Sequence, residues 1–124
     1  MSPTSWLLAG SLCILMAGAQ AHGDWPAKHG GIMNEGGETS FELVAKGRKA
    51  VFHVEDHGSP IDMKGAHGTL TVTRGSQSWT STISPAGANR MESQMPRPLR
   101  RGDRALARVT LANGSIVAGR FGIK

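Results

Sequence analysis

Cysteine, tyrosine and long apolar runs are scarce in this 124-residue chain. It contains one cysteine, Cys13, and no tyrosine. A lone cysteine excludes an intramolecular disulfide, and its place near the N-terminus leaves residues 22–124 without a thiol. Thiolate metal sites and cysteine nucleophiles are therefore excluded for that part of the chain.

The first 21 residues carry no charged side chain. Residues 7–17 read LLAGSLCILMA and precede Ala19-Gln20-Ala21, as the apolar core of a secretory signal peptide precedes its cleavage site. The apolar run, about 11–13 residues, is too short for a transmembrane helix. We therefore expect residues 1–21 to be a cleaved signal peptide. The mature protein would start at His22, lie in the periplasm and keep no transmembrane anchor.

Acidic side chains are few, and they are unevenly placed. Residues 22–67 contain seven acidic side chains, five Lys or Arg and all five histidines, whereas residues 68–124 contain two acidic and nine basic side chains. Because an exported protein does not meet nucleic acid, the net charge of +5 favours an acidic protein surface or anionic lipid headgroups as partners.

Helical periodicity is also nearly absent. Seventeen glycines, six prolines and short β-branched runs predict antiparallel strands. Residues 40–45 and 50–57 predict one hairpin, and residues 68–74 and 78–83 predict a second. Within 50–57, Phe52 and Val54 alternate toward the core, so His53 and Glu55 are expected to face outward.

A third hairpin is predicted within residues 104–123, around Asn113-Gly114. A two-residue turn would set Leu111 opposite Ile116, whereas one bulged residue would set Leu111 opposite Val117, and both registers stay open. Residues 84–103 are too long and proline-rich for a tight turn and are expected to form a loop.

These elements predict an all-β fold, a small antiparallel β-sandwich or partly open barrel of about six strands. The domain organisation that follows is the signal peptide at 1–21, a flexible Gly/His-rich segment at 22–39 and the β-sandwich domain at 40–124.

The histidines are the residues most suited to carry chemistry. Imidazole suits copper, zinc and nickel, and the methionine thioether suits copper(I) or silver. After cleavage, His22 would offer an amine and an imidazole on one residue, and His29 or His57 could add a second imidazole. His57 and His67 flank the connection between two predicted strands, with Met63 between them. The candidate metal ligands are His29, His57, His22, His67 and Met63.

Other residues fit ordinary structural roles better. His53 is expected to be a solvated strand residue, and the arginines around Met91 and Met95 would repel a metal ion there. The arginines of the 84–103 region and its edge form either a solvated face or a docking surface: Arg97, Arg100, Arg101 and Arg104. No Ser-His-Asp order, phosphate loop or HExxH motif occurs, so no enzyme activity is expected.

Several short motifs together resemble a known group of proteins. They are His29-Gly30-Gly31, the FELV strand at 41–44, Asp56-His57, the GAHG start at 65–68 and the PAGANR turn at 85–90. This combination is similar to small periplasmic β-domain proteins associated with heavy-metal efflux systems of the resistance-nodulation-division class, and to segments of their adaptor subunits. The resemblance implies a domain that binds or hands over a transition metal, with His29 and His57 as the matching ligand positions.

The first functional hypothesis is therefore an exported, non-enzymatic protein that buffers or hands over copper, or else zinc or silver, in an efflux or resistance system. The alternative is a β-sandwich interaction module that docks through its arginine-rich loop to a pump or envelope protein. A copper enzyme with a histidine brace at His22 is the third, and it is disfavoured because a small sandwich leaves little room for a substrate cleft.

Overall fold

The computed structural model describes residues 26–124. Within them the regular structure is entirely β, in nine strands that form one antiparallel sheet. No helix in this range has the length and apolar character to cross a membrane. The strands are β1 (Ile32–Met33), β2 (Thr39–Lys46), β3 (Lys49–Asp56), β4 (Ser59–Pro60), β5 (His67–Arg74), β6 (Gln77–Pro85), β7 (Arg90–Gln94), β8 (Arg104–Thr110) and β9 (Ile116–Gly122).

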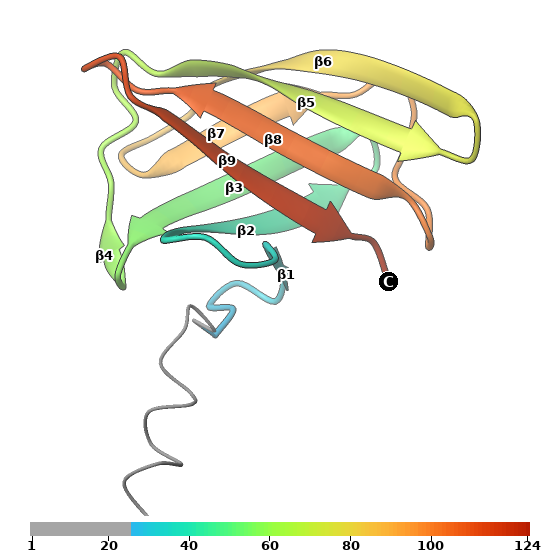
Figure 1. Cartoon of the computed structure of the whole chain (residues 1–124), viewed down its shortest axis with the longest axis horizontal. Helices are drawn as coiled ribbons and strands as arrows, with labels where there is room; N and C mark the ends of the chain where they lie inside the picture. Colours follow the sequence, from blue (N-terminus) through green and yellow to red (C-terminus); the bar gives the residue numbers. More distant parts are fainter. Residues whose placement is uncertain (1–25) are drawn as a thin grey trace, which may run out of the picture.

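The sheet is rolled nearly into a barrel. Its order is β1-β2-β3-β7-β6-β5-β8-β9, with β4 paired to the end of β3. In Figure 1 the strands β5, β6, β8 and β9 form the upper layer, and β2 and β3 run beneath them. The two edge strands of the sheet, β1 and β9, approach each other next to a hydrogen bond in which the Glu35 N–H donates to the Arg120 carbonyl oxygen, at 2.8 Å. The predicted all-β, antiparallel class is confirmed. Of the two expected arrangements, a sandwich or a partly open barrel, the sheet is nearer to the barrel, and it has nine strands where about six were expected.

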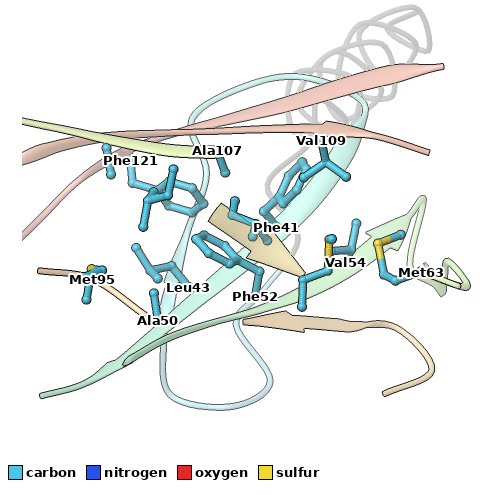
Figure 2. Close-up of a cluster of buried hydrophobic side chains, with 14 of the residues drawn as sticks. Phe41, Leu43, Ala50, Phe52, Val54, Met63, Met95, Ala107, Val109 and Phe121 are labelled. Carbon is cyan, nitrogen blue, oxygen red and sulfur yellow. The ribbon is translucent and has the colours of Figure 1, made fainter. Parts of the chain in front are cut away.

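Alternating side chains from both layers fill the barrel. Phe41 and Phe52 project from β2 and β3 toward Val109 and Phe121 on β8 and β9, as Figure 2 shows. The rings of Phe52 and Phe121 lie 6.0 Å apart at their centroids, with a tilt of 52° that suits aromatic quadrupoles. As predicted, Phe52 and Val54 are buried, and His53 and Glu55 lie on the outer face.

The six predicted strands are present, but the chain forms three more. The largest correction is β7, which lies inside the segment expected to be a loop. Met91, Ser93 and Met95 alternate into the core, and β7 pairs with both β3 and β6. Only two methionines and a serine carry that alternation among polar neighbours, which hid the strand in the sequence.

The third hairpin also differs from both expected registers. Val109 pairs with Val117, and the turn is a three-residue connection between Leu111 and Ser115. The Gly114 N–H donates to the Leu111 carbonyl oxygen at 2.9 Å, and Gly114 takes a φ of 90°. This is a type I turn closed by a left-handed glycine, so Asn113-Gly114 does mark the turn but not a two-residue one.

Candidate functional site

The site begins where the chain before β1 folds over the outer face of β2 and β3. Gly31 runs so close to β2 that a Cβ there would lie 2.5 Å from the Leu43 carbonyl oxygen, so only glycine fits. This approach places the backbone of residues 28–31 above Glu42. That glutamate points outward by strand alternation, yet the segment covers it and leaves it 4% exposed.

Glu42 fastens this segment to the sheet. Its Oε1 accepts the Lys28 N–H at 2.9 Å, and its Oε2 accepts the N–H groups of His29 and Gly31, both at 2.8 Å. The His29 ring nitrogen Nδ1 lies 3.0 Å from Oε1. Burial works to raise the pKa of Glu42, but the hydrogen bonds from the His29 side chain and the three backbone amides outweigh it and lower the pKa to about 2.

The ionised carboxylate determines the tautomer of His29. A carboxylate with a pKa of about 2 can only accept hydrogen bonds near neutral pH, so Nδ1 of His29 must donate. In the neutral ring the lone pair is then on Nε2, and the His29 side chain is 45% exposed. His29 therefore presents a coordinating or proton-accepting nitrogen whose ring orientation is held by a buried acid.

His53 completes the site as the ring next to His29. The two imidazoles stack, with centroids 3.7 Å apart and planes within 6°. Burial, followed by the charges of His29 and Arg90, lowers the pKa of His53, although Glu42 and Glu55 act in the opposite direction. The lowered pKa favours the neutral form of the His53 imidazole in the stack, and a neutral imidazole keeps one nitrogen lone pair available.

Beside the histidine pair the outer face of β2, β3 and β7 forms a cavity of about 360 Å³. Cross-strand pairing arranges the outward side chains of these strands in rows, and successive rows are about 7 Å apart. The rows, in the order β2, β3, β7, are Glu42, His53 and Arg90; Val44, Val51 and Glu92; Lys46, Lys49 and Gln94.

His57 lies where the second predicted strand ends, as expected, but it is not the histidine beside His29. It occupies the turn between β3 and β4 with a φ of 51°, followed by Gly58 at 85°, the geometry of a type I′ turn. Its Nδ1 lies 2.8 Å from Oδ1 of Asp56, and its side chain is 68% exposed. His57 follows His53 by four positions, about 13 Å along an extended strand, and the ring that stacks on His29 is that of His53.

The remaining expected ligands are dispersed. His67 is exposed at the start of β5 and pairs across to Thr110 on β8. Met63 is fully buried in the core, where Figure 2 places it beyond Val54. His22 lies outside the described residues, as does the expected signal peptide.

The arginine-rich stretch is partly built into the fold. The guanidinium of Arg97 lies over the Trp79 ring at 4.5 Å, with Arg74 over the same ring at 4.8 Å. Arg104 approaches Glu35 at 3.3 Å. Arg100 and Arg101 are exposed next to Asp103, a buried acid that accepts two hydrogen bonds from Arg74.

The sequence reasoning missed Glu42 as a site residue and set His53 aside. A signal for both was available, because Glu42 and His53 face outward on the two strands of a predicted hairpin and come directly opposite when Gly47-Arg48 forms its turn. What no pattern showed was the chain folding back to place His29 on them.

Within residues 26–124 no group of three or more His, Cys, Asp or Glu side chains is placed to hold a metal ion. Comparisons with protein-family models, with curated proteins and with solved structures find no match to this chain.

Proposed function

We propose that this protein binds a transition metal ion, copper or else zinc or silver, through His29 and His53. The observation that carries the proposal is the buried Glu42 carboxylate, which fixes His29 with Nδ1 protonated and Nε2 free. Carboxylates placed behind histidine ligands in this way set the tautomer and raise the basicity of the ligating nitrogen. Imidazole suits copper and zinc.

Two protein ligands leave further coordination positions open to water or to small ligands. The stacked rings lie parallel, so their lone pairs do not converge on one point. Coordination by both therefore requires the stack to open by rotation of the His53 side chain, because the contact with Glu42 holds His29 in place. Since the pKa of His53 is lowered, its nitrogen needs no deprotonation near neutral pH.

The wider role follows from the sequence. An apolar segment followed by Ala-Gln-Ala supports export to the periplasm, and the resemblance of several short motifs to heavy-metal efflux domains supports a part in metal resistance. Because the sequence contains no catalytic motif that we identify, the role we propose is buffering or handing over the ion. An efflux adaptor or another acidic envelope protein is the proposed recipient, reached through the exposed arginines.

Metal titration of the purified protein tests the proposal. We expect saturable binding of copper(II) or zinc with a Kd of about micromolar or tighter. His29→Ala and His53→Ala should each weaken binding by at least about tenfold. His57→Ala is the matched control, because it also removes one imidazole but at a turn away from the stack, and it should leave the affinity unchanged.

His22 is tested separately with His22→Ala on protein whose N-terminus has been verified by mass spectrometry. Binding that is unaffected by His29→Ala and His53→Ala, but lost in His57→Ala, would contradict the site proposed here. Absence of binding for copper(I), copper(II) and zinc would refute the function itself.

A further inference from the structure

The cavity beside the histidines has a surplus of positive charge. Lys46 and Lys49 pair directly across β2 and β3, and both line the cavity together with Arg90. Like charges directly opposite in a sheet destabilise it. Glu92 is the one acid in the lining, and it is 3.6 Å from the Lys49 ammonium and 3.9 Å from the Arg90 guanidinium. One acid thus faces three cations.

The three cations differ in the hydrogen-bond and ion-pair partners that the protein offers each of them. Arg90 donates from Nε and Nη2 to the Ala86 carbonyl oxygen, at 3.1 and 2.8 Å. Lys49 has Glu92. Among the described residues, Lys46 has neither an ion-pair nor a side-chain hydrogen-bond partner, and this exposed lysine with its three donors lines the cavity. An anion would therefore bind at the Lys46 and Lys49 end.

The apolar side chains that line the cavity favour an organic anion over an inorganic one. Val44 and Val51 lie directly opposite each other between the lysine pair and the histidine pair, and both remain partly exposed. Apolar surface of this kind is covered favourably by an apolar body and not by a hydrated inorganic ion. A cavity of about 360 Å³ lies within the size range of small-molecule sites.

We propose that this cavity binds a small organic carboxylate. Its carboxylate group lies between the ammonium groups of Lys46 and Lys49, and its apolar body covers Val44 and Val51. The far end of the body meets the imidazole pair. The site goes beyond the proposed metal binding and needs no metal, because all of its contacts come from side chains of the protein.

Benzoate, titrated into the full chain by calorimetry or NMR at low salt with EDTA present, is the probe. We expect saturable binding in the millimolar range or tighter. Lys46→Ala should weaken it by at least about fivefold, and Val51→Ser should weaken benzoate while leaving any phosphate binding unchanged. Arg108→Ala is the matched control, since it removes an exposed positive charge from β8, outside the cavity, and should have no such effect. Thermal melting verifies that each variant is folded.

Three results would overturn the proposal. They are no saturation by benzoate up to about 10 mM, an equal loss of affinity in Arg108→Ala, and inorganic phosphate binding as tightly as benzoate. The test is separate from that of the metal site. Benzoate binding without any metal binding would refute the proposed function alone, and metal binding without benzoate binding would refute this inference alone.

Discussion

Replacing Glu42 by glutamine should be among the most destabilising conservative changes in this chain. The carboxylate has two oxygens, and three backbone N–H groups and one ring nitrogen converge on them. A glutamine retains the shape but has one oxygen, so its amide NH₂ would face other donors. At least one backbone N–H of residues 28–31 would then be buried without a partner, at a cost of about 1–3 kcal/mol.

The lowered pKa of Glu42 gives a second estimate of how much this carboxylate stabilises the folded protein. Glu42 has a pKa of about 2 in the folded protein against an ordinary value of 4.5. At about 1.4 kcal/mol per pKa unit, the folded state gains about 3 kcal/mol from ionising this group. Because the folded pKa is depressed, this stability is present above about pH 4.5 and is lost as pH falls toward 2.

Urea denaturation at a series of pH values measures both effects. Near pH 6 we expect Glu42→Gln to lower the free energy of unfolding by about 2–3 kcal/mol. Between pH 5 and about pH 2 the wild type should lose stability faster than the variant, so the two curves converge. The comparison is needed because the pKa of Asp103 is also lowered, and that group titrates in both proteins.

Glu38→Gln is the control for loss of a charge, since Glu38 is exposed near the start of β2, and it should change stability by less than about 0.5 kcal/mol. The reasoning is refuted if Glu42→Gln costs less than about 1 kcal/mol near pH 6. It is equally refuted if the stability difference between wild type and variant is the same at pH 6 and pH 3.

Three further predictions concern other parts of the fold. Asp103→Ala should cost about 3 kcal/mol in urea denaturation, because it leaves Arg74 without its buried partner, and a loss below about 1 kcal/mol would argue against that pair. Gly68→Ala should lower the melting temperature markedly, since a Cβ there would overlap the carbonyl oxygen of the facing β8 strand, whereas Gly122→Ala, whose Cβ meets only side-chain ends, should change it little. The imidazole of His53 should titrate below pH 6.5 by NMR, because burial lowers its pKa, and a midpoint at or above 6.5 would contradict that environment.

The strands that the sequence predicted share one property, a local partner. Residues 40–45 and 50–57 are joined by a short turn, as are 68–74 and 78–83, so period-two alternation and turn residues suffice to place them. β7 also has a local partner, since it pairs with the end of β6 across residues 86–89, but its alternation rests on Met91 and Ser93 and is too weak to predict a strand. Its pairing with β3 joins residues about 40 positions apart, such as Phe52 and Met91, and no local pattern encodes such a contact.

The site could be predicted only in part for the same reason. His29 was identified as a candidate, and its motif with two glycines matches the tight approach that the structure shows at Gly31. The choice of its partner depended on where residues 28–31 fold back, and that is decided by four hydrogen bonds to Glu42. A glutamate in a strand that alternates with apolar residues ordinarily indicates a solvated face, so its burial was not apparent.

The central place of β7 also bears on how the protein folds. The hairpins β2–β3, β5–β6 and β8–β9 can each form from residues close together in the chain, within microseconds for an isolated hairpin. The short strand β7 lies between β3 and β6; it pairs with β6 across the short turn at residues 86–89, but it reaches β3 only through long-range pairs. Pairing β7 with β3, like pairing β5 with β8, closes a long loop and costs entropy before core contacts such as that of Met91 offset it, so we expect these two steps to be slower than hairpin formation.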